Sequence, residues 1–337
     1  MPSHLPSERK NSPAATAAPV FNVAFFLVPG FSMMALSSAV EPLRSVNRMV
    51  GECRYDWHIV AKEKGPVSAG NKLEITAAHG LADSPCCDLT IVVASLDAEG
   101  YHEPKVFEWL RKRHEERGML GAVSNGTLIL ARAGLLAGRR ATIHWEMQRW
   151  LAEEFPAIKV RADLYCIDRD VMTAAGGIAA MDMMLAMIAE RDGREIAADV
   201  SEQFLHGPVR ASTERQRRDV RWRYDVTDRR LVTIIRLMEE NLSDPIKISQ
   251  ISDVAGVSER QMERLFESAL GTSPSEFYLR IRLRVARARL LHSTESLEKI
   301  SDFCGFSSPG HFSNAFKICY GEPPSIVRRR TQDEPSG

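Results

Sequence analysis

Polar side chains that can read DNA bases recur on two predicted helices near the C-terminus. The outward residues of these helices are Arg260, Gln261, Glu263 and Arg264 in the first, and His311, Ser313 and Asn314 in the second. Arginine can form two hydrogen bonds to guanine in the major groove, and asparagine can form two to adenine. These residue types at helical spacing predict sequence-specific DNA binding, provided that the fold holds both faces outward.

The elements that must position these residues are two copies of one motif. Residues 251–258 read ISDVAGVS, and residues 300–307 read ISDFCGFS. The same landmarks follow each copy: Met262, Leu265, Phe266, Gly271 and Pro274 in the first, and Phe312, Ala315, Phe316, Gly321 and Pro324 in the second. Two such copies in one chain can contact two successive turns of a DNA duplex without a partner subunit.

Each copy has the features of a helix-turn-helix. Gly256 supplies the positive φ of the turn, and Ser258 can cap the second helix. The residues expected to pack are Ile251, Val254, Ala255, Met262, Leu265, Phe266 and Ala269. In the second copy Ser307 or Ser308 is the cap. Cys304 occupies the place of Ala255, so we expect a small buried thiol there.

A basic amphipathic segment, residues 275–291, joins the two copies. Its arginines alternate with apolar residues and are Arg280, Arg282, Arg284, Arg287 and Arg289. We expect its apolar face to dock both units and its basic face to meet phosphates, with Arg282 among the DNA contacts. A rigid helix here would set the recognition helices about one duplex turn, ~34 Å, apart. The alternative is a helical dimerisation module with charged outer faces.

The charge of the 337-residue chain is zero overall but unevenly distributed. Residues 1–208 carry 22 Lys and Arg against 26 Asp and Glu, whereas residues 209–330 carry 22 against 16. This asymmetry is expected when only one end of a protein meets nucleic acid. The six cysteines form no C-x-x-C pair, which favours reduced thiols in the cytosol over disulfides or a metal site. No apolar run approaches the ~18 residues that span a bilayer.

The N-terminal part alternates apolar runs with amphipathic stretches, which predicts a doubly wound, flavodoxin-like α/β domain. The predicted strands are 20–28, 56–61, 89–94, 120–123 and 171–173, and the predicted helices are 32–49, 104–117, 127–133, 144–154 and 178–191. The predicted division is a disordered leader (1–19), an α/β domain (20–200), a basic linker (201–224), an all-α domain (225–330) and a tail (331–337). The arginines of 210–223 either touch phosphate or form a solvated spacer.

Residues 228–330 resemble the AraC/XylS family of transcription regulators over the whole two-unit DNA-binding domain. The most specific stretch is ISDFCGFSSPGHFSNAF at 300–316, followed by GEPP at 321–324. The resemblance implies that six of the outward residues read bases: Arg260, Glu263, Arg264, His311, Ser313 and Asn314. The family often has arginine where this chain has Asn314, so adenine is the expected partner there. Activation through RNA polymerase is also implied by the resemblance.

Residues 20–200 resemble the ThiJ/PfpI superfamily, relatives of class I glutamine amidotransferases, in the form fused to AraC-type domains. The resemblance rests on VPGF at 28–31, LARAGLLAGRRATIHW at 130–145 and TAAGG at 173–177. Enzymatic members have a cysteine in the turn after the central strand, with a histidine close by. Here that turn reads AVSNG, with Ser124 in place of the cysteine. A serine hydroxyl stays protonated at neutral pH and needs a well-placed base, for which His144 is the candidate.

We therefore expect the former catalytic turn to be a ligand pocket. A turn that opens a helix presents free amides and partial positive charge, which suit a carboxylate. The expected ligand contacts are Glu41, Ser124, Asn125, Gly126, His144 and Trp145. Glu41 either binds a cationic group or pairs with Arg44 at the surface. Together these groups suit an amino acid or a betaine- or carnitine-like zwitterion, and the chain resembles regulators of glycine betaine, carnitine and arginine use.

The sequence thus predicts a cytoplasmic bacterial transcription regulator. A small metabolite in the α/β domain is expected to control how the helical domain of a homodimer binds promoter DNA. No catalytic residue, metal, cofactor or membrane is expected to take part. The alternative is a ThiJ/PfpI-type amidase or hydrolase that uses Ser124 and His144 and carries a helical accessory domain.

Overall fold

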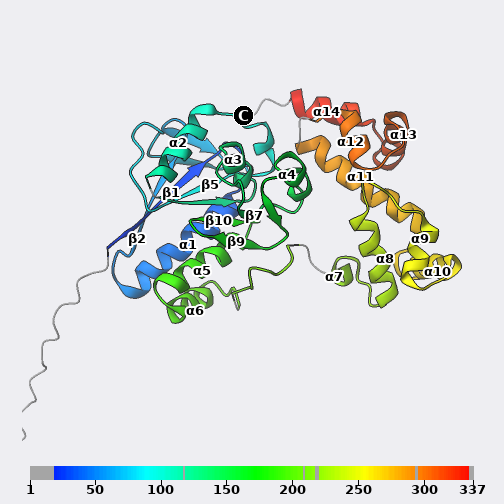
Figure 1. Cartoon of the computed structure of the whole chain (residues 1–337), viewed down its shortest axis with the longest axis horizontal. Helices are drawn as coiled ribbons and strands as arrows, with labels where there is room; N and C mark the ends of the chain where they lie inside the picture. Colours follow the sequence, from blue (N-terminus) through cyan, green and yellow to red (C-terminus); the bar gives the residue numbers. More distant parts are fainter. Residues whose placement is uncertain (1–18, 117, 208, 217–219, 293–294, 334–337) are drawn as a thin grey trace, which may run out of the picture.

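The computed structural model describes residues 19–116, 118–207, 209–216, 220–292 and 295–333. These residues form an N-terminal α/β domain and a C-terminal helical domain (Figure 1). The predicted leader lies outside the described range except for residue 19, and so do residues 334–337 of the predicted tail. Among the described helices, none has the length and apolar character needed to cross a membrane.

A six-stranded sheet with the strand order β2-β1-β5-β6-β10-β9 forms the centre of the N-terminal domain. The strands are β1 (Phe21–Leu27), β2 (Tyr55–Val60), β5 (Leu89–Val93), β6 (Met119–Val123), β9 (Tyr165–Asp168) and β10 (Val171–Ala174). All neighbours are parallel except β10 and β9. The five predicted strands are confirmed to within one residue at each end, and β9 is an additional edge strand.

Helices cover both faces of this sheet, so the strands are buried on both sides. Side chains alternate along β1, so that Val23 and Phe25 face one helical layer while Ala24 and Phe26 face the other. The first layer contains α1 (Met33–Val50), α5 (Ala179–Arg191) and α6 (Arg194–Gln203). The second contains η1 (Leu96–Gly100), α2 (Pro104–Glu115), α3 (Gly126–Arg132) and α4 (Gln148–Glu154). This is the doubly wound fold that the sequence predicts.

Several further elements are not predicted by the sequence. They are β3 (Gly65–Ser68), β4 (Glu74–Ala77), β7 (Arg140–Thr142), β8 (Lys159–Arg161), α6 and α7 (Val220–Tyr224). The strands among them have three or four residues, too few to show a period. The predicted helix 144–154 begins only at Gln148, because residues 145–147 form a turn. His144 therefore lies in a loop.

The helical domain has two apolar cores that share one helix. Its main helices are α8 (Arg229–Glu240), α9 (Ile248–Ala255), α10 (Glu259–Leu270), α11 (Pro274–His292), α12 (Leu297–Phe303), α13 (Pro309–Tyr320) and α14 (Pro324–Asp333). Phe277 and Ile281 of α11 pack in the first core with α8, α9 and α10. Leu283 and Leu290 pack in the second core with α12, α13 and α14. The prediction of two helix-turn-helix units joined by one helix is confirmed.

Two residues expected to pack are exposed. Val254 has 66% of its surface exposed, and Ala269 is exposed in the last turn of α10. The buried residues of α9 are Ile251 and Ser252. Successive side chains of a helix are rotated by about 100°, so the side chain of Val254 points away from this buried face. Cys304 is fully buried as predicted, and burial raises the pKa of its thiol to about 12.

The segment predicted as a basic linker is largely attached to the two domains. Arg210 forms an ion pair of 2.6 Å with Asp182, whose side chain is completely buried. Leu164 N donates to Ser212 O at 2.8 Å. Arg223 pairs with Glu239 of α8 at 2.6 Å. Arg210 and Arg223 therefore stabilise the fold, whereas Arg215 is exposed, and a contact of this segment with phosphate stays a prediction.

Candidate nucleic-acid interface and effector site

The first recognition helix, α10, is fixed at both ends. Ser258 Oγ accepts from Gln261 N at 3.2 Å, and Gln261 Oε1 accepts from Ser258 N at 2.9 Å. Gly256 and Gly271 adopt positive φ values of 66° and 61° at the preceding turn and at the C-terminus. Because this capping box satisfies free amides reciprocally, the start of α10 is well defined.

The predicted base-reading residues of α10 lie on its outer face. Arg260, Glu263 and Arg264 are exposed, and none of their side chains has a hydrogen bond or ion pair within the described residues. Gln261 differs, because its side-chain oxygen is used by the cap. The S-x-x-Q spacing is a signal in the sequence that identifies this role. Its amide nitrogen remains as the group that could meet a base.

The second recognition helix, α13, repeats the arrangement. Ser308 Oγ accepts from His311 N at 3.2 Å, which identifies Ser308 as the cap. His311 is exposed, and its Nδ1 lies 3.2 Å from Ser307 Oγ. Asn314 is exposed and Ser313 is partly buried. The two helices therefore present polar side chains at equivalent places.

Arg282, predicted to contact DNA, points into the helical domain. Its Nε donates to Cys304 O at 2.7 Å, and its Nη2 donates to Gly305 O at 2.5 Å. Its guanidinium lies 4.3 Å from the ring centroid of Phe306. Burial lowers the pKa of this guanidinium. Cys304 is the C-cap of α12 and Gly305 follows it, so Arg282 satisfies backbone carbonyls at the end of this helix. Arg282 was predicted to contact DNA, but its guanidinium instead stabilises the turn after α12.

The other arginines of α11 also have partners inside the protein. Arg280 pairs with Glu276, Arg284 donates to Tyr224, Arg287 lies over Tyr320 and Arg289 pairs with Glu295. Arg289 is buried, whereas the first three are exposed. The basic face expected along this helix is thus mostly occupied by intramolecular contacts.

A close contact fixes the second turn against the loop before α9. Gly305 has φ = +68°, and a Cβ there would collide with Pro245 and lie 2.8 Å from Ser243 O. The first half of α11 packs with α10 and its second half packs with α13; Figure 1 shows α11 running between the two units. This contact and α11 together set the relative placement of the two recognition helices.

In the N-terminal domain, Ser124 occupies a tight turn between β6 and α3. Its φ of 56° is unusual for a residue with a side chain. A Cβ at Gly176 would lie 2.8 Å from Ser124 Cβ, and one at Gly126 would collide with Val92 O. Ser124 is 6% exposed and Asn125 is fully buried. Glycines therefore allow the turn to form, and the side chains of Ser124 and Asn125 are enclosed in it.

His144 and Trp145 lie in the loop after β7, which is attached to α3. Thr127 Oγ1 donates to Thr142 O at 2.8 Å, so the loop starts beside the helix that Ser124 precedes. His144 Nδ1 lies 3.7 Å from Glu146 Oε2. The ring centroids of His144 and Trp145 are 5.5 Å apart. Glu146 is an acid beside His144 that was not predicted from the sequence, although it lies only two residues away.

Glu41 pairs with Arg44 at the surface, which is one of the two alternatives that the sequence left open. Arg44 donates to Glu41 Oε2 through Nε at 2.7 Å and through Nη2 at 2.6 Å. Both side chains are more than one-third exposed. The pair is separated by three residues on α1, a common spacing for surface ion pairs. Glu41 is therefore engaged at the helix surface.

Gln216 connects the segment between the domains to the loop that contains His144. Its Nε2 lies 2.9 Å from each of Thr142 Oγ1, Ile143 O and Asp163 O. Ile143 directly precedes His144. A movement of the loop would therefore displace Gln216.

Two family profiles match the chain. The DJ-1/PfpI family matches residues 22–190, and a helix-turn-helix domain matches residues 251–330. The chain is 40% identical over 304 residues to the HTH-type transcriptional regulator CdhR of Pseudomonas aeruginosa, covering 90% of each protein. It is 35% identical over 313 residues to the HTH-type transcriptional regulator GlxA of Rhizobium meliloti, covering 93% of this chain and 97% of that protein.

A solved structure is also similar to this chain. The crystal structure of an AraC family transcriptional regulator from Pseudomonas putida is 26% identical, with a TM-score of 0.52. The alignment covers 55% of this chain and 99% of that one.

Proposed function

We propose, because this chain belongs to the AraC-type transcriptional regulators with an N-terminal DJ-1/PfpI domain, that a small zwitterion controls its binding to promoter DNA. The zwitterion binds at the Ser124 turn, and α10 and α13 read the DNA. The family is that of bacterial DNA-binding regulators. The effector and its action are the new elements of the proposal.

The observation that carries the proposal is the contact of Gln216 with the loop before His144. The three short distances from Gln216 Nε2 connect this loop to the chain between the domains. A ligand that binds one loop conformation more tightly shifts the population toward it. Gln216 can transmit that shift toward the helical domain.

The chemistry of the turn supports a zwitterion. The Ser124 hydroxyl, the Asn125 side-chain amide and the Gly126 backbone amide are donors of the kind that hold a carboxylate. Trp145 and Glu146 offer an aromatic ring and an acid for a cationic group. An amino acid or a betaine- or carnitine-like compound has both charges. Glu146 takes the role that the sequence suggested for Glu41.

Activation through RNA polymerase and action as a homodimer complete the proposal. Both rest on the resemblance to AraC/XylS regulators. Analytical ultracentrifugation with and without promoter DNA measures the oligomeric state. Transcription from the promoter with purified polymerase measures activation.

The test uses the full-length protein and three probes: glycine betaine, carnitine and arginine. A true effector at 100 times its Kd should raise the free energy of unfolding by about 2.7 kcal/mol. It should also change the affinity for promoter DNA measured by fluorescence anisotropy. No thermal shift with any probe would count against this effector class. Turnover of an amide substrate that is abolished by Ser124→Ala would instead support the hydrolase alternative.

A further inference from the structure

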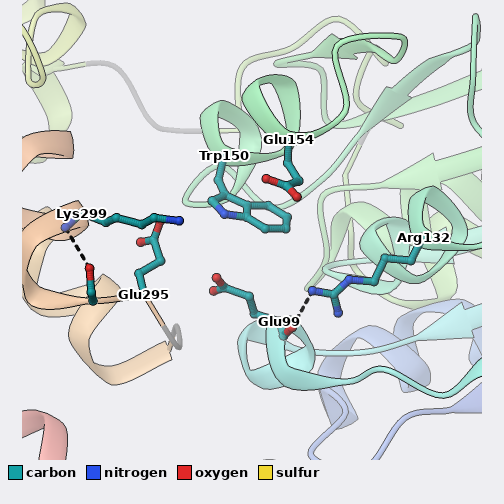
Figure 2. Close-up of a pocket in the computed structure, with 7 residues that line it drawn as sticks. Glu99, Arg132, Trp150, Glu154, Glu295 and Lys299 are labelled. Atoms are coloured by element: carbon teal, nitrogen blue, oxygen red, sulfur yellow. Dashed lines mark hydrogen bonds between the residues drawn. The ribbon is translucent and has the colours of Figure 1, made fainter.

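A cavity of about 350 Å³ lies between the two domains, and no residue of the Ser124 turn is among those that line it. Figure 2 shows side chains from both domains around it. The N-terminal domain contributes Glu99, Arg132, Trp150 and Glu154, and the helical domain contributes Glu295, Ser296 and Lys299. Cavities of this size accept small molecules.

Glu99 is a buried acid whose carboxylate points into this cavity (Figure 2). It is 8% exposed, and its carboxylate has no hydrogen bond or ion pair within the described residues. Arg132 is close, but its guanidinium donates to the backbone carbonyls of Glu99 and Tyr101. Arg289 forms two bonds of 2.7 Å with Glu295. A buried charge without a partner is costly, so an ionised Glu99 favours an added cation.

The surrounding groups indicate what kind of cation would fit. Figure 2 shows the indole of Trp150 beside the Glu99 carboxylate, with Glu154 on its other side. Lys299 reaches toward the same space but forms no ion pair with the described residues. No group of three His, Cys, Asp or Glu side chains in the described chain is spaced to hold a metal ion. An aromatic face favours a weakly hydrated organic cation.

We propose that this cavity is a second ligand site, which binds a small organic ammonium ion between the Glu99 carboxylate and the indole of Trp150. It is distinct from the zwitterion site at Ser124 and does not depend on it. Both domains line the cavity, so the bound cation stabilises their observed contact. Arg149 adds to this contact by hydrogen bonding to Ser243 and lying 4.7 Å from the ring centroid of Phe303.

Isothermal titration calorimetry on the full-length protein tests the site with tetramethylammonium and 1,4-diaminobutane, against sodium chloride at equal ionic strength. We expect at least one probe to bind, and Glu99→Gln to weaken it tenfold or more. Glu298→Gln removes the same charge from the exposed face of α12 and should leave the affinity unchanged.

Trp150→Leu provides a second variant if Glu99→Gln does not fold, and it should also weaken binding tenfold or more. Absence of heat with both probes would overturn the proposal. So would equal affinity of wild type and Glu99→Gln, because the cation would then lie elsewhere. Ser124→Ala should not affect cation binding, which separates this test from that of the effector site.

Discussion

Arg264 and Arg282 both lie in basic, helical sequence, but the fold gives them different surroundings. Arg264 is exposed without a side-chain partner in the described structure, whereas Arg282 binds two backbone carbonyls. An arginine whose donors are already used inside the protein has few left for DNA. The role of each arginine therefore depends on which neighbour the fold supplies.

Replacing Arg264 should affect base recognition. We expect Arg264→Ala to weaken specific DNA binding by roughly 1–3 kcal/mol and to relax base choice at one position. Arg280→Ala is the matched control, because it removes an exposed arginine from α11. Anisotropy with a set of single-base operator variants measures the effect. Equal loss of affinity on every sequence would show that Arg264 contacts phosphate only.

The turns of the two helix-turn-helix units are equivalent in sequence but differ in packing. Gly256 and Gly305 have φ values of 66° and 68°. A Cβ at Gly256 meets nothing within 4 Å, whereas one at Gly305 collides with Pro245. The second turn therefore adds a direct contact between the two units to the connection that α11 provides.

This difference predicts unequal effects of the same substitution. Gly256→Ala should cost roughly 1–2 kcal/mol, because only the left-handed conformation is penalised. Gly305→Ala should cost a further 1–3 kcal/mol, roughly, from overpacking. Urea unfolding of both variants measures the free energies. Equal destabilisation would mean that the loop at Pro245 moves aside without cost.

In the whole molecule, Gln216 is the contact through which the effector site can influence the helical domain. Gln216→Ala should leave effector binding intact and reduce the coupling to DNA binding by roughly 1 kcal/mol or more. Gln203→Ala, on the exposed surface of α6, is the control. DNA affinity measured with and without effector gives the coupling. An unchanged ratio in Gln216→Ala would exclude this route.

The contact between the domains should depend on pH through Glu99. Burial raises its pKa from 4.5 to about 7, and the charge of Glu295 adds to this, while Arg289, Arg132 and Arg328 oppose it. The folded protein therefore binds this proton more tightly than the unfolded chain. Stability should fall as pH rises from about 4.5 to 7, by at most roughly 3 kcal/mol.

Glu99→Gln should remove this part of the pH dependence. Urea unfolding of wild type and Glu99→Gln, at one pH below and one pH above this range, measures the difference. A stability profile that is the same in both proteins would show that Glu99 is not protonated in the folded state.

Local patterns in the sequence are enough to specify the two domains, their main strands and helices, and the duplicated DNA-reading unit. These features follow from periodicity, from capping residues such as Ser258 and from turn glycines such as Gly256, all of which act over a few residues. The partner of each charged side chain depends instead on tertiary packing. In the sequence Arg282 and Glu41 are both polar residues of predicted helices, and Glu99 lies in a stretch without a predicted element. Their different roles arise because other segments of the folded chain supply carbonyls, an ion pair or an enclosed cavity.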